Sequence, residues 1–136
     1  MKTTDYVDYP TAVALKKCGF DEPCSGKYVD CPKDPTLFRR MEYPAWNLEK
    51  DEVIAPSLYE AQKWLREEKG IDVLVWNCAC GYGWEISKAD PQSRGTTLKF
   101  YDDNGEDRDS GMWLTYENAL SAGINVALQL LDNAKK

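Results

Sequence analysis

The sequence of 136 residues contains no histidine. Histidine is the commonest general base in enzymes, the usual partner of serine and cysteine nucleophiles, and the commonest metal ligand. The sequence also lacks a G-x-S-x-G nucleophile elbow, a G-x-x-x-x-G-K-[ST] phosphate loop and a G-x-G-x-x-G dinucleotide fingerprint. We therefore expect a protein that is not an enzyme, with no catalytic residue and no cofactor.

The cysteines do not form a standard metal-binding or disulfide pattern. There are five, an odd number: Cys18, Cys24, Cys31, Cys78 and Cys80. In a chain that shows no sign of export, this number indicates reduced thiols in a cytoplasm. Cys78 and Cys80 are separated by one residue, and Cys24 and Cys31 by more than four. Neither pair has the C-x2–4-C spacing that is typical of zinc knuckles, so we expect no metal site. The sequence alone leaves open whether Cys24, Cys31, Cys78 and Cys80 lie near one another.

The N-terminal residues are polar, and no apolar run approaches the length of a membrane span. These absences predict a cytoplasmic protein that does not enter a membrane. Acidic residues outnumber basic ones by 23 to 17, which gives a net charge of −6. Basic residues form no cluster larger than a pair, so we expect no binding to nucleic acid.

Capping and periodicity predict three helices and several strands. The first helix is expected from about Pro10 to Cys18 and is closed by Gly19. The second helix follows the capping box formed by Ser57 and Glu60 and ends at Gly70. The third helix runs from Tyr116, after the cap Thr115, to about Asn133. Strands are expected at 28–31, 37–41, 71–76, 84–87 and 96–101, with 71–76 and 84–87 forming a hairpin. Residues 43–56 are expected to be irregular, and 102–111 to form a polar loop.

This order of elements predicts one α+β domain that spans residues 1–136. The expected arrangement is αββαβββα, with three helices packed on a mainly antiparallel sheet of about four to five strands. The last helix is apolar around much of its circumference, so it is either central in the domain or part of a dimer interface.

Aromatic residues are numerous and gather near the predicted hairpin and the start of the last helix. The set is Trp76, Tyr82, Trp84 and Trp113. Aromatic side chains fill cores well, so one interpretation is a well-packed interior. However, Val73 and Val75 share one face of their strand while Leu74 and Trp76 share the other, so both faces of the sheet are apolar. The alternative is therefore an aromatic surface that binds a partner.

Several segments resemble a family of small proteins from Bacteroides-type gut bacteria, often encoded in prophages or mobile elements. The resemblance lies in 14–24, which contains an LKKxGFDEPC-like motif, and in Ala55-Pro56-Ser57, Trp64-Leu65-Arg66-Glu67, Trp84-Glu85-Ile86 and 116–120. These segments coincide mostly with caps, turns and core faces, so the resemblance implies a shared fold. The family has no assigned activity, so it implies no catalytic or ligand-binding residue.

Taken together, these features predict a non-enzymatic accessory protein that binds another protein or a second copy of itself. A phage-related role is what the resemblance implies. One alternative is a small-molecule binder or minor enzyme with an aromatic-lined pocket near Trp76 and Trp84 and a carboxylate such as Glu85. A further alternative is an acidic mimic of DNA that occupies a basic protein.

Overall fold

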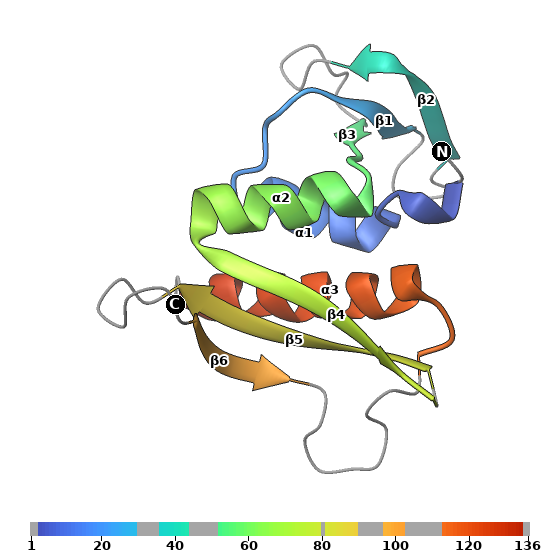
Figure 1. The fold of residues 1–136 in the computed structure, drawn as a ribbon. Coiled ribbons are helices and arrows are strands. Elements are labelled where there is room, and N and C mark those ends of the chain that lie inside the picture. Colours follow the sequence, from blue (N-terminus) through green and yellow to red (C-terminus); the bar gives the residue numbers. More distant parts are fainter. Residues whose placement is uncertain are drawn as a thin grey trace.

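The computed structural model describes residues 3–29, 36–43, 52–79, 81–89, 97–102 and 113–134, which form an α+β fold (Figure 1). After a short 3-10 helix at Thr3–Asp5, the elements are α1 (Tyr9–Lys17), β1 (Cys24–Val29), β2 (Thr36–Tyr43), β3 (Val53–Ile54), α2 (Leu58–Lys69), β4 (Ile71–Cys78), β5 (Gly81–Ala89), β6 (Thr97–Asp102) and α3 (Tyr116–Ala134).

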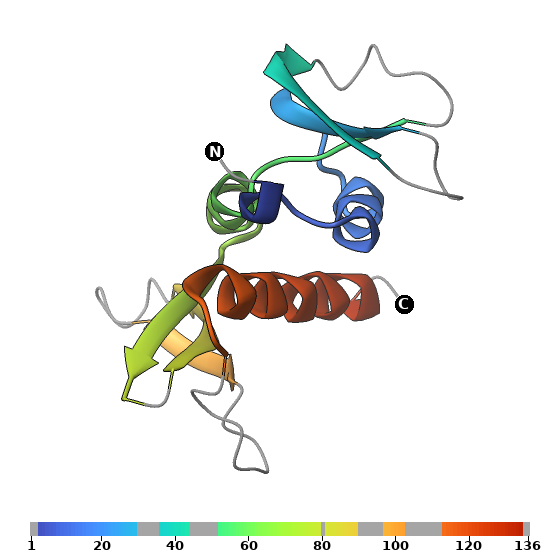
Figure 2. The same cartoon turned by 90° about the vertical axis from the view of Figure 1, so that its right-hand side faces the viewer.

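The strands form two antiparallel sheets, in the orders β2-β1-β3 and β4-β5-β6. In Figure 1 the first sheet lies above α1 and α2, and the second lies below α3. Figure 2 shows α1 and α2 nearly end-on above α3, which runs lengthwise across the view. The helices therefore form the interior layers and the sheets form the outer ones.

The two outer sheets correct the expectation of one sheet with about four to five strands. The three helices and the antiparallel hairpin lie where the sequence predicts them, but β1 begins at Cys24, four residues before the predicted strand at 28–31, and it pairs with β2 and β3 and not with the hairpin. β3 falls within 43–56, which was expected to be irregular, and it adds a strand to the predicted order. The reason is that α3 is apolar on more than one side and packs on β4 and β5 as well as on α1 and α2, so the helices separate the sheets instead of covering one of them.

Helix α1 begins one residue earlier than predicted, because Asp8 is its N-cap and accepts a hydrogen bond from the backbone N–H of Thr11 at 3.0 Å. At its other end Gly19 adopts a positive φ of 101°, and the N–H of Phe20 donates to the carbonyl of Leu15 at 2.9 Å. This bond closes the helix as the sequence predicts.

The predicted capping box opens α2. The backbone N–H of Ser57 donates to Glu60 Oε1 at 2.8 Å, and the backbone N–H of Glu60 donates to Ser57 Oγ at 3.1 Å. Gly70 ends the helix in the left-handed conformation and leads directly into β4. The predicted cap of α3 is also present, because Thr115 Oγ1 accepts from the N–H of Asn118 at 3.0 Å.

Helix α3 takes the central position, which was one of its two predicted roles. Its buried residues are Ala119, Leu120, Ile124, Ala127 and Leu128. It packs on β4 and β5 on one side and on α1 and α2 on the other. The hydroxyl of Thr11 on α1, which is 1% exposed, donates to Asn125 Oδ1 on α3 at 2.9 Å. A polar bond thus fixes α1 against α3 within an otherwise apolar contact.

No helix in the described ranges combines the length and the apolar character that a membrane span requires.

Gly123 lets α3 approach the lower sheet closely. A Cβ atom at this position would lie 2.6 Å from Val73 Cγ1 on β4 and 3.2 Å from Trp84 Cβ on β5. Both Val73 and Trp84 are buried, so neither has room to move.

We therefore predict that Gly123→Ala destabilises the protein by about 1–3 kcal/mol, although alanine is the better helix former by about 1 kcal/mol. Urea unfolding measures this cost. In the Val73→Ala background, where the Cγ1 atom is missing, the same change should cost much less. Equal costs in the two backgrounds would show that close approach to Val73 is not the reason for the glycine.

Candidate functional site

The structure separates the four aromatic residues that the sequence singled out. Trp84 lies on the inner face of β5, under α3, and is 4% exposed. It therefore belongs to the core and not to a binding surface. Trp84 is paired with Val75 across the β4–β5 ladder, and directly paired residues lie on the same face of a sheet. Trp84 therefore shares the inner face with Val73 and Val75.

Trp76 lies on the opposite, outer face of the same hairpin. Its indole ring covers Gly83, its cross-strand partner, so closely that a Cβ atom at Gly83 would overlap the ring. This packing buries one side of the ring and the backbone of β5 together. Glu85, which the sequence suggested as a carboxylate for an aromatic pocket, lies opposite the exposed Leu74 on this outer face.

Tyr82 and Trp113 do come together, where the chain enters α3. They exchange two backbone hydrogen bonds, from Tyr82 N to Trp113 O at 2.9 Å and from Trp113 N to Tyr82 O at 3.1 Å. The Tyr82 ring packs edge-to-face on Tyr116, with ring centroids 6.1 Å apart. Both the hairpin end and the first turn of α3 therefore contribute aromatic rings to one place.

Two further apolar side chains belong to this place and were not singled out from the sequence. Tyr59 on α2 is 38% exposed, and its hydroxyl donates to Glu117 Oε2 at 2.8 Å. Leu114 is 85% exposed, the most of any large apolar side chain in the described part of the structure. We call Tyr59, Tyr82, Trp113, Leu114 and Tyr116 the aromatic patch.

Leu114 directly precedes the N-cap Thr115. A hydrophobic residue in this position commonly packs against the first turns of its helix as a staple. Here it extends into solvent beside Trp113, which is 38% exposed. Its position before a helix cap could have been noticed in the sequence. Only the structure shows that Leu114 is exposed instead of packing on the first turns of α3.

The charges next to the aromatic patch are negative. The hydrogen bond to Glu117, with a smaller contribution from the charge of Asp5, raises the pKa of Tyr59 to about 12. Asp5 therefore lies close enough to act on the same hydroxyl. The patch thus combines exposed apolar rings with negative charge.

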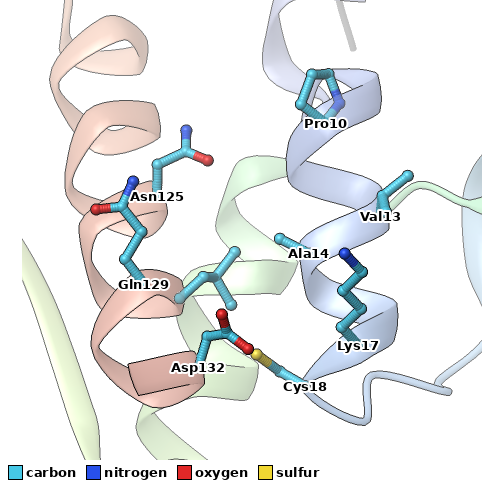
Figure 3. Close-up of a pocket in the computed structure, with 9 residues that line it drawn as sticks. Pro10, Val13, Ala14, Lys17, Cys18, Asn125, Gln129 and Asp132 are labelled. Atoms are coloured by element: carbon cyan, nitrogen blue, oxygen red, sulfur yellow. The ribbon is translucent and has the colours of Figure 1, made fainter. Parts of the chain in front are cut away.

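A groove lies between α1 and α3, away from the aromatic patch (Figure 3). It has a volume of about 210 Å³. Figure 3 shows Pro10 and Val13 towards one end, Cys18 and Asp132 towards the other, and Asn125 and Gln129 along the α3 side. Sites for drug-sized ligands usually have volumes of about 300–1,000 Å³, so this groove suits a group the size of one side chain.

A second cavity, of about 160 Å³, lies between α2 and the turn that follows α1. It is lined by Phe20, Glu22, Pro23, Glu60, Lys63, Trp64 and Glu67. Two of these lining residues, Phe20 and Trp64, pack edge-to-face, and both are buried. Neither cavity is lined by Trp76, Trp84 or Glu85, so neither is the aromatic-lined pocket that the sequence suggested.

Two of the five cysteines are described in detail, and both are buried thiols. Cys18 lines the groove between α1 and α3, and Cys24 begins β1. Cys31, Cys80 and the side chain of Cys78 lie outside the described part of the structure, so the distances among the four cysteines stay open. In the described part, no three cysteine or carboxylate side chains are grouped closely enough to hold a metal ion.

Comparisons with protein-family models, with curated proteins and with solved structures found no match to this chain.

Burial raises the pKa of the Cys24 thiol from 9.0 to about 12, with smaller effects of the same sign from Glu60 and Glu22. The thiol is therefore protonated at neutral pH and is a poor nucleophile. Because the folded pKa is the higher one, the stabilisation by the neutral thiol is complete below pH 9 and declines as the pH rises from 9 towards 12.

We predict that the wild type loses on the order of 1 kcal/mol of stability relative to Cys24→Ala between pH 7 and pH 10. Urea unfolding of both proteins under reducing conditions measures the difference, and the other four thiols cancel in it. A difference that does not change with pH would mean that Cys24 ionises as readily in the folded as in the unfolded chain.

Proposed function

We propose that this chain is a non-enzymatic accessory protein that binds another protein through the aromatic patch. The observation that carries the proposal is the exposure of Leu114, at 85%, beside the partly exposed rings of Trp113, Tyr116 and Tyr59. Scattered apolar side chains are normal on a surface, but a connected group of aromatic residues is typical of interaction sites.

The patch residues are connected physically and not merely close in sequence. Backbone hydrogen bonds join Trp113 to Tyr82, ring packing joins Tyr82 to Tyr116, and Tyr59 is fixed to α3 by its bond to Glu117. These contacts hold the rings in place before a partner arrives, which reduces the entropy lost on binding.

The charge beside the patch favours a basic partner. Glu117 is hydrogen-bonded to Tyr59, the negative charge of Asp5 also raises the pKa of the Tyr59 hydroxyl, and the whole chain carries a net charge of −6. Complementary charge increases the rate of encounter and excludes acidic partners. We infer a protein partner that presents an apolar pocket bordered by lysine or arginine.

The chemistry of the chain supports a role in binding and not in catalysis. It has no histidine, and the neutral, buried thiol of Cys24 is unsuited to nucleophilic attack.

The second candidate is a binder of small apolar molecules, in the groove between α1 and α3 and not near Trp76 or Trp84. It is favoured by the apolar side chains of Val13, Ala14 and Leu128 beside the amides of Asn125 and Gln129. A fragment screen by NMR that shifts these residues specifically would support it, and the absence of such shifts would remove it.

We also propose that the chain belongs to the Bacteroides-type family whose motif its residues 15–24 resemble, and that it works in the cytoplasm in a phage-related process. The position of its gene among phage genes would support this assignment, and a position in an unrelated operon would weaken it.

We predict that Leu114→Lys weakens binding to the protein partner by about 30-fold, since truncating or charging a central apolar contact costs on the order of 2 kcal/mol. The partner would be captured from the cell of origin with the wild type, purified, and measured by titration calorimetry. Increasing salt should also weaken the complex, because part of the attraction is electrostatic.

Phe38→Lys is the matched control. Phe38 is also an exposed apolar residue, at 46%, but it lies on β2 in the upper sheet, so the same substitution there should leave the affinity unchanged (Figure 1). Equal affinities of the wild type and Leu114→Lys would contradict the proposed binding surface. Turnover of a substrate that is lost when one side chain is truncated would contradict the non-enzymatic role.

A further inference from the structure

Among the edge strands of the described structure, β4 has the longest run without a charged residue, from Val73 to Cys78. β4 is the first strand of the order β4-β5-β6 and pairs with β5 without a break, from Ile71 opposite Lys88 to Cys78 opposite Gly81. Its other edge therefore faces away from the sheet.

The hydrogen bonds around the hairpin show which backbone groups point outward from this edge. Tyr82 uses its N–H and C=O on Trp113, on the side away from β4, so Asn77 and Tyr82 form a non-hydrogen-bonded pair. Since the pairs alternate along an antiparallel ladder, Val75 and Val73 also direct their backbone groups outward. The carbonyl of Val73 confirms this, because it accepts from Gln62 Nε2 on α2 at 2.7 Å.

Gln62 thus satisfies the outward carbonyl of Val73. Further along the strand, no described residue supplies a hydrogen bond to the outward N–H and C=O groups of Val75 and Asn77. Alternate N–H and C=O groups at this spacing are complementary to one kind of structure, an extended strand.

The other sheet edges carry features that normally prevent strand addition. β2 contains Arg39, Arg40 and Glu42, β6 contains Lys99 and Asp102, and β3 has only two residues. β4, in contrast, enters a stretch without charge or proline that extends from Val73 to Trp84. Natural proteins usually protect long edges with charges, proline or bulges, so an unprotected edge of this length indicates a pairing site.

We propose that β4 pairs with β4 of a second copy of this chain, antiparallel and about a two-fold axis beside Trp76. In this register the N–H and C=O groups of Val75 bond to those of Asn77 in the second copy, and the reverse pair forms by symmetry. The outward N–H and C=O groups of Val75 and Asn77 that form these bonds have no hydrogen-bond partner among the described residues. The hydrogen bond from Gln62 to Val73 is retained.

A second copy suits this edge because the alternating outward N–H and C=O groups of β4 are complementary to those of an antiparallel β4. Strand pairing about a two-fold axis closes after two chains and does not continue into a fibre. The net charge of −6 would oppose association in general, but the pairing segment itself is neutral, and the carboxylate of Asp72, which precedes this segment on β4, lies 3.9 Å from the guanidinium of Arg66. Leu74, 41% exposed on the outer face, would gain cover from the added strand.

This dimer does not rest on the proposed function, because the β4 edge and the aromatic patch are different surfaces. If both hold, the dimer presents two aromatic patches, and a partner with two binding sites would gain avidity from them.

The test compares Asn77→Pro with Asn77→Ala in analytical ultracentrifugation of the full chain. Asn77 is exposed and its N–H points away from β5, so proline removes only the donor to the second copy and leaves the β4–β5 ladder intact. We expect the wild type and Asn77→Ala to sediment as two-chain species and Asn77→Pro as a single chain with an unchanged circular dichroism spectrum.

Leu74→Lys serves as a second variant that does not alter the backbone, and it should raise the dissociation constant of the dimer at least tenfold. A wild type that sediments as a single chain at several hundred micromolar overturns the proposal. So does a dissociation constant that Leu74→Lys leaves unchanged, or dimerisation of a folded Asn77→Pro. Leu114→Lys should leave the dimer intact, which separates a failure of the edge proposal from a failure of the aromatic patch.

Discussion

The contact between α3 and the lower sheet is the constraint on which the rest of the structure depends. Gly123 allows the helix to lie directly on Val73 and Trp84, so α3 covers these two residues of β4 and β5. The other side of α3 then packs on α1 and α2, and α1 in turn packs on β3 of the upper sheet. A buried Trp84 is one consequence. The other is that the rings at the start of α3 are held beside the end of the hairpin.

Local structure could be predicted well from the sequence because its signals are local. The capping box at Ser57 and Glu60, the terminator Gly19 and the cap Thr115 each act through backbone groups within a few residues. The hairpin and its following strand also appear where β-forming residues alternate with turn residues. These features depend on neighbours in the chain, so a single sequence contains the information that fixes them.

Pairing and burial could not be predicted in the same way, because they depend on residues far apart in sequence. Nothing local in β1 indicates that it pairs with β2 and β3 instead of joining the hairpin. Likewise Trp76 and Trp84 look equivalent in sequence, yet they lie on opposite faces of one sheet. Only the position of α3 decides that Trp84 is covered and that Trp76 lies over Gly83 on the outer face.

The same layering explains why the candidate binding surfaces lie where they do. With the helices inside and a sheet on each outer side, large apolar side chains stay exposed where no helix covers them, and two such places are the start of α3 and the outer face and free edge of β4. Leu114 and Leu74 represent these two places, and each is far more exposed than the leucines of the interior, such as Leu65 and Leu120. Both binding proposals therefore rest on apolar side chains that the packing of the helices leaves exposed.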